Sequence, residues 1–169
     1  MRSKKLDMFL DYYVNNALFI DCIIVIAVWF INSEICIFDF ATPSKEDNIS
    51  IISDIISASL SLAGFILAAL TIIAAMRANI INKPAEAARN PLELFFSNGS
   101  YRKIMVVFRD SIIELTLVFI IAFITTFSKE NLDKEFLFKI IIIFILLISL
   151  STIRSLLVLF TIIGIRDSE

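Results

Sequence analysis

Histidine is missing from this sequence, and glycine is scarce. The 169 residues include no His and 3 Gly. The chain therefore lacks the commonest general base and the commonest metal ligand, and its few glycines form no Gly-rich phosphate loop. Motifs of the types C-x-x-C, H-E-x-x-H and G-x-S-x-G are also missing. These absences predict a protein that is not an enzyme and that has no metal site or other cofactor.

The cysteines and the net charge exclude two further classes. Cys22 and Cys36 lie about 21 Å apart if one helix holds both, so they cannot pair with each other in a disulfide scaffold. The formal net charge is −2, from 15 Lys and Arg against 17 Asp and Glu. A charge so close to zero gives no general attraction for nucleic acid, and any anion site has to be local.

Apolar residues, in contrast, are abundant. They make up 59% of the chain, against roughly 45–50% in soluble proteins, and the mean hydropathy is +0.89. Each long apolar run exceeds the ~20 residues that cross a ~30 Å hydrocarbon core. The runs cover residues 14–38, 51–76, 104–127 and 137–165. We expect residues 1–169 to form one all-α integral membrane domain with four transmembrane helices.

Basic residues predict the orientation of these helices. Arg2, Lys4 and Lys5 precede the first run, and further basic residues border the loop 77–103. The positive-inside rule then places the N-terminus, this loop and the C-terminus in the cytoplasm. A cleaved signal peptide is the alternative for the first run, but Asp21 interrupts it and no small-x-small site follows. We therefore expect a retained signal anchor.

A stripe of small and polar residues runs along the second helix. The spacing alternates between four and three residues, which keeps one face of a helix toward a partner in a left-handed bundle. Its members are Ser50, Asp54, Ser57, Ser61, Gly64, Ala68, Thr71, Ala75 and Ala78. Either the stripe allows close helix packing, or copies of it line a pore in a homo-oligomer. Asp54 favours the pore, as an acidic outer ring, with Arg77 at the inner end.

Charged residues also interrupt the other helices. Glu114 and Arg154 both lie roughly 15 Å from the inner membrane face, so an ion pair between them is expected. Asp21 and Arg109 are closer to that face and form a second expected pair. Such pairs fix the register of the helices, or they act as a gate, a proton relay or an anion site.

The loop 77–103 has two interpretations. Its basic residues set topology and attract anionic lipid, or they bind a cytoplasmic partner protein, a nucleotide or an oligonucleotide. The candidates for such binding are Lys83, Arg89, Arg102 and Lys103.

The stretch LAGFILAALT at residues 62–71, in a short four-pass chain without histidine, resembles small membrane proteins of bacterial antiphage systems. The Hailong-type membrane effector and the Kiwa membrane subunit are the two types in question. The resemblance implies a homo-oligomer, such as a tetramer, in the bacterial inner membrane. A Hailong-like protein would be an ion-conducting effector controlled by a nucleic-acid-type ligand. A Kiwa-like protein would be a sensor with a cytoplasmic partner protein.

Together these patterns favour an oligomeric, cation-conducting channel that depolarises the membrane, with antiphage defence as the implied role. A non-conducting sensor or scaffold that binds a cytoplasmic partner is the first alternative. A small exchanger, with Glu114 or Asp54 as the carrier carboxylate, is the second.

Overall fold

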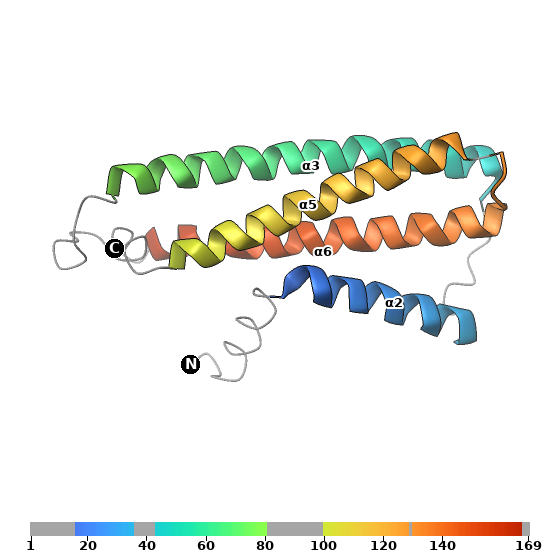
Figure 1. Ribbon diagram of the computed structural model, residues 1–169, viewed down its shortest axis with the longest axis horizontal. Coiled ribbons are helices and arrows are strands. Elements are labelled where there is room, and N and C mark those ends of the chain that lie inside the picture. Colours follow the sequence, from blue (N-terminus) through green and yellow to red (C-terminus); the bar gives the residue numbers. More distant parts are fainter. Residues whose placement is uncertain (1–15, 36–42, 81–99, 129, 167–169) are drawn as a thin grey trace.

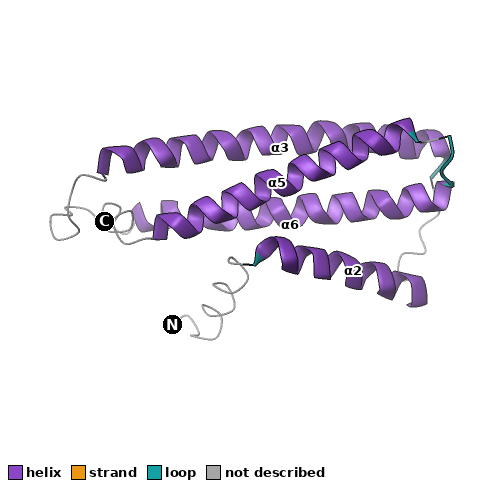
Figure 2. Ribbon diagram, viewed as in Figure 1, coloured by secondary structure: helices purple, strands orange, loops and turns teal. Residues whose placement is uncertain are grey.

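The computed structural model describes residues 16–35, 43–80, 100–128 and 130–166, and every regular element in these ranges is a helix (Figures 1 and 2). The expected all-α architecture is therefore confirmed for these residues. Their helices are α2 (Ala17–Ile35), α3 (Lys45–Ile80), α5 (Ser100–Phe127) and α6 (Lys134–Arg166).

Helix α3 is longer than the apolar run that predicted it. It begins directly after Ser44, whose Oγ accepts a hydrogen bond from the Asp47 backbone N at 3.2 Å. The Asp47 carboxylate in turn accepts one from the Ser44 backbone N at 3.3 Å. This reciprocal capping starts a helix in a polar segment that hydropathy assigns to a loop. The residues at both borders of the expected loop 77–103 are likewise helical.

Helices α3, α5 and α6 pack against one another, and α2 contacts α5 and α6 (Figure 1). Two apolar clusters form the interior. One joins Ile66 of α3 to Phe108 and Leu115 of α5, and the other joins Ile52 of α3 to Val118 of α5 and Phe144 of α6. Helix α3 therefore lies along one side of the bundle, and α2 lies on the opposite flank.

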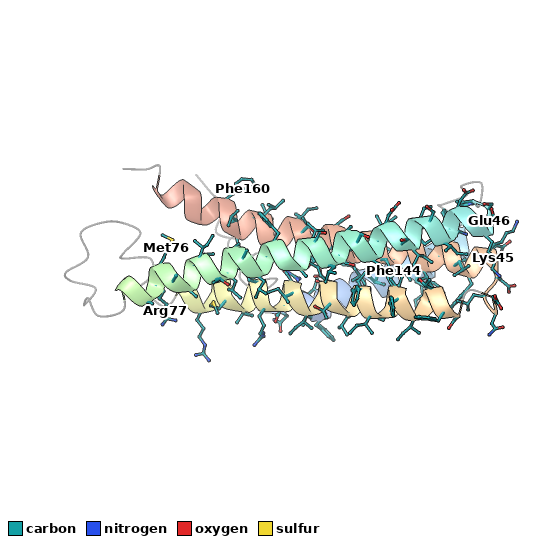
Figure 3. All side chains as sticks on the ribbon, turned by 90° about the horizontal axis from the view of Figure 1, so that it is seen from above. Lys45, Glu46, Met76, Arg77, Phe144 and Phe160 are labelled. Atoms are coloured by element: carbon teal, nitrogen blue, oxygen red, sulfur yellow. The ribbon has the colours of Figure 1, made fainter. Side chains whose placement is uncertain are left out.

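The outer surface of the helices is strongly apolar. Large side chains are exposed on every helix, with Phe127 at 76%. The charged residues Lys45 and Glu46 lie at one end of α3, and Arg77 lies near the other end (Figure 3). Two segments in the described ranges are long and apolar enough to cross a membrane: Lys45–Ala78 and Lys134–Phe160. This surface fits association with a membrane.

Candidate functional site

Helix α3 packs on the bundle through one regular seam. The seam residues are buried or half-buried and follow one another at intervals of four and three residues. They are Asn48, Ile52, Ile55, Ser59, Leu62, Ile66, Ala69 and Ile73. A repeat of this kind keeps a continuous line of side chains against the neighbouring helices. The apolar interior of the bundle is built on this seam.

The stripe of small and polar residues lies on the opposite face of α3. From Ser50 to Ala75 each stripe residue comes two positions after a seam residue, which is a rotation of about 200° around the helix axis. Every stripe residue is exposed. At Gly64 an added Cβ would meet no atom within 4 Å. The stripe therefore plays no part in packing among the described residues, and it is open to a second molecule, to lipid or to water.

The polar groups of the stripe fall into two kinds. The hydroxyl groups of Ser57 and Thr71 donate to the backbone carbonyls of Ser53 and Leu67, at 3.1 and 2.8 Å. Such hydroxyl groups are tolerated in an apolar medium, because backbone carbonyls of the same helix accept their hydrogen bonds. No described residue forms an ion pair with Asp54, and its exposed carboxylate cannot be satisfied in this way. Asp54 is thus the stripe residue that most requires water or a partner.

Arg77 does not belong with the stripe. It lies four residues after Ile73 and is half-buried, so it continues the bundle-facing seam. Its assignment as an inner pore residue stays a prediction, although its position follows the seam repeat instead of the stripe repeat.

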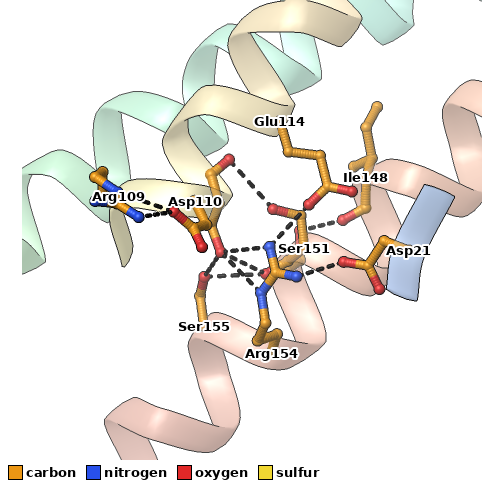
Figure 4. A network of polar contacts seen from close by, with 10 residues as sticks. Asp21, Arg109, Asp110, Glu114, Ile148, Ser151, Arg154 and Ser155 are labelled. Atoms are coloured by element: carbon orange, nitrogen blue, oxygen red, sulfur yellow. Dashed lines mark hydrogen bonds and ion pairs between the residues drawn. The ribbon is translucent and has the colours of Figure 1, made fainter. Parts of the chain in front are cut away.

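A cluster of buried charges joins the other three helices, and we call it the buried charge centre: Asp21, Glu114 and Arg154. Arg154 of α6 donates from Nη1 to the Asp21 carboxylate of α2 and from Nη2 to Glu114 Oε2 of α5, the latter at 2.8 Å (Figure 4). All three residues are at most 5% exposed. The expected pair of Glu114 and Arg154 is therefore present, and a second carboxylate shares the same guanidinium.

Buried serines complete the hydrogen bonds of this centre. The Ser111 hydroxyl lies 3.2 Å from Arg154 Nη2, and it accepts a hydrogen bond from Ser155 Oγ at 2.9 Å. Ser151 Oγ donates to the Ser111 carbonyl at 3.3 Å, which links α6 directly to α5. A buried guanidinium is stable only when such partners accept hydrogen bonds from its N–H groups.

The expected pair of Asp21 and Arg109 was wrong. Asp21 binds Arg154, and Arg109 binds its neighbour Asp110 at 2.8 Å with a side chain that is 63% exposed. Arg109 and Glu114 are five residues apart on one helix, which is about 140° of rotation. The two side chains therefore leave α5 in different directions, and only Glu114 faces α2 and α6.

Serines of the centre were missed by the sequence analysis, although a signal was present. Ser111 precedes Glu114 by three residues, and Ser151 precedes Arg154 by three residues. Polar residues at such spacing occupy one face of an otherwise apolar helix, and that face here is the buried one. In a membrane helix a serine beside a charge indicates a hydrogen-bonded site.

The basic candidates of the loop 77–103 are divided between α5 and a segment that the structure does not describe. Arg102 is exposed on the first turn of α5, and Lys103 follows it on the same helix. Lys83 and Arg89 lie outside the described residues.

The sequence matches no protein-family model, and no curated protein or solved structure matches it. Function therefore has to be argued from the exposed stripe and the buried charge centre themselves.

Proposed function

We propose that this chain is a four-pass membrane protein that assembles into a homo-oligomeric, cation-conducting channel, with the stripe of α3 facing the central axis. The observation that carries the proposal is the exposure of the whole stripe on the face of α3 opposite the bundle seam. A repeat that is maintained along a helix, and that no described residue of the chain covers, is expected to face a symmetry axis or a second chain.

The composition of the stripe suits a narrow aqueous path. Its small side chains leave space on the axis, and the Ser57 and Thr71 hydroxyls retain oxygen lone pairs after bonding to their own helix. Helix α3 has 36 residues, so it is about 54 Å long and extends about 12 Å beyond each side of a ~30 Å core. Asp54 is then just inside the outer boundary, where a ring of carboxylates would concentrate cations.

A non-conducting scaffold is the second candidate, and one observation favours it. Since the hydroxyl groups of Ser57 and Thr71 donate to carbonyls of their own helix, the stripe around these two residues can also pack dry against a neighbouring helix. In that case the stripe is the contact between subunits, and ions have no path along it. The basic residues beside the loop 77–103 would then recruit the cytoplasmic partner or ligand.

One pair of variants separates the two candidates. Ser61 lies on the stripe, whereas Ser53 is also exposed but lies between the seam and the stripe. Ser61→Leu in a pore should lower single-channel conductance in planar bilayers several-fold and leave the oligomer intact. The same change at Ser53 should alter neither property. Loss of the oligomer in Ser61→Leu, seen by light scattering in detergent, would instead identify the stripe as a packing surface and overturn the pore.

The antiphage role implied by the resemblance stays a prediction. It requires that the protein depolarise the membrane of the cell that carries it. A voltage-sensitive dye in infected and uninfected cells tests this, with Asp54→Asn as the comparison.

A further inference from the structure

Helices α3 and α6 leave a groove between them on one flank of the bundle. The two helices diverge toward the end that carries Arg77 and Phe160 (Figure 3), and the groove lies along this stretch with a volume of about 150 Å³. Its walls include Phe65, Ile66 and Ala69 of α3, Phe108 of α5, and Leu156 and Leu159 of α6. An apolar cavity of about this volume binds a molecule the size of benzene. The groove can therefore take one large apolar side chain.

The groove offers no hydrogen bond to an occupant. The two hydroxyl groups beside it belong to Thr152 and Ser155 of α6. Thr152 Oγ1 donates to the Ile148 carbonyl at 2.7 Å, and Ser155 Oγ donates to Ser111 Oγ at 2.9 Å. The surface that remains accessible in the groove is apolar. Such a site stays dry, so its occupant is either a lipid chain or an apolar side chain of another protein molecule.

Large apolar side chains flank the stripe of α3 on both sides. Leu60 and Leu67 directly precede stripe residues, whereas Phe65 and Ile72 directly follow them. At about 100° per residue the two pairs leave α3 on opposite sides of the stripe. All four are between 54% and 62% exposed, so the described bundle leaves both flanks accessible. Since Phe65 also lines the groove, the groove opens on one of these flanks and Leu67 lies on the other.

We propose that the groove between α3 and α6 receives the side chain of Leu67 from a second copy of this chain. The contact rests on the proposed homo-oligomer. If the stripe faces the axis, every α3 has a neighbouring subunit on each flank, and the Leu67 flank of one copy meets the groove of the next. A second copy, and not lipid, then covers the groove.

The height of Leu67 along the helix matches the groove. Rotation about an axis parallel to the helices keeps equivalent residues of all copies at the same height. Leu67 lies between Ile66 and Ala69, which line the groove, and its Cβ is tilted toward the N-terminal end of α3. Its side chain therefore reaches the neighbouring groove at the level where that groove is lined by the same segment of α3.

The contact joins two different surfaces, which has a consequence for the assembly. A contact of this kind repeats from copy to copy and closes into a ring. Close packing of an apolar side chain in a fitting hole is what holds helices together in lipid, where burial from water contributes nothing. The contact also leaves the stripe itself uncovered, and it does not depend on whether ions pass.

Disulfide crosslinking of the full-length protein tests this contact. The background is Cys22→Ala with Cys36→Ala, which removes both natural cysteines. Leu67→Cys is combined with Leu156→Cys, because a disulfide forms only between Cα atoms within about 7 Å. Mild oxidation should then link neighbouring chains and give bands from the dimer up to the complete ring on a non-reducing gel.

The matched control combines Leu67→Cys with Leu157→Cys. Leu157 is also exposed, at 53%, but it leaves α6 about 100° further round the helix from Leu156. We expect at least tenfold less linked product from this pair. Linked dimers in Leu67→Cys alone would overturn the proposal, because two copies of the same flank would then meet.

Light scattering in detergent separates the remaining outcomes. An intact oligomer of the Leu67→Cys, Leu156→Cys variant that yields no linked chains would overturn the contact and leave the proposed oligomer standing, with lipid in the groove. A wild type that is monomeric would overturn the contact together with the proposed assembly.

A second variant covers the case in which the double cysteine variant does not assemble. Leu67→Ala empties the groove of the neighbouring copy, so the protein concentration at half-dissociation of the oligomer should rise several-fold. Leu157→Ala should leave it unchanged. Equal dissociation of the wild type and Leu67→Ala would overturn the contact.

Discussion

Asp21 and Arg154 form an ion pair between residues 133 positions apart in the sequence, with side chains that are 0% and 2% exposed. Arg154 also bonds Glu114, so a single guanidinium connects α2, α5 and α6. Buried charges of this kind are stable only while each keeps its partner. We therefore expect the relative placement of these three helices to depend on Arg154.

Arg154→Gln should destabilise the folded protein severely. The change leaves two buried carboxylates without a cation, and breaking a buried pair costs about 3–5 kcal/mol. Lys134→Gln is the control, because Lys134 is exposed in the first turn of α6, where a substitution typically changes the free energy of unfolding by about 0.5 kcal/mol or less. Denaturant unfolding in detergent, followed by circular dichroism, measures both.

Neutralising the whole centre should recover much of this loss. The triple variant Asp21→Asn, Glu114→Gln and Arg154→Met contains no buried charge, and such replacements are often neutral or stabilising. A triple variant as unstable as Arg154→Gln alone would mean that the lost packing of the arginine stem, and not its charge, explains the single variant.

The single tryptophan of the chain can report whether α2 stays attached. Trp29 lies edge-on to Phe136 of α6 at 6.5 Å, with Lys139 Nζ 6.0 Å from its ring. The described residues of α2 that are buried are Ala17 and Asp21. Asp21→Ala should therefore loosen α2 and increase the quenching of Trp29 fluorescence by brominated lipid chains. Cys22→Ala changes the exposed residue that follows Asp21, and it should leave the quenching of Trp29 fluorescence unchanged.

The sequence predicted the helices well and their lateral arrangement poorly. Long apolar runs located every described helix. The expected distances of Glu114 and Arg154 from the inner membrane face, estimated from their positions along two helices, predicted the ion pair that these residues form. The distance from the membrane face could not show that Asp21 also binds Arg154. Neither this distance nor hydropathy carries information on which helices are neighbours. The start of α3 was missed, since its first turns are polar and depend on capping by Ser44.

The two faces of α3 show a further limit of the sequence. Both the seam and the stripe repeat at four and three residues, so periodicity could not decide which one faces the bundle. Side-chain size decides it: the large residues Ile52, Ile66 and Ile73 fill the apolar interior, which small residues could not fill.

Gly64→Ala tests whether the stripe is open in the assembly. The added methyl group meets no other atom of the described residues within 4 Å, and replacing glycine by alanine inside a helix stabilises it by about 1 kcal/mol. If the stripe faces an aqueous axis, the variant should be more stable than the wild type. Ala68→Gly, the reverse change on the same stripe, should lose a similar amount. A Gly64→Ala oligomer that dissociates more readily would indicate close helix contact at this position.

Asp54→Asn should reduce cation selectivity without changing the assembly. In the proposed pore, each subunit contributes one carboxylate near the outer boundary, and their combined field attracts cations. The neutral amide keeps the size of the side chain but removes this field, so the permeability ratio of cation to anion should fall several-fold in bilayer recordings. Glu135→Gln is the control, because Glu135 is exposed in the first turn of α6 and lies off the stripe.

The effect of Asp54→Asn on cation selectivity should weaken as salt is raised, since the Debye length falls from about 10 Å at 0.1 M to 3 Å at 1 M. Equal reversal potentials in the wild type and Asp54→Asn at low salt would remove Asp54 from the ion path and with it the assignment of the stripe as the pore lining.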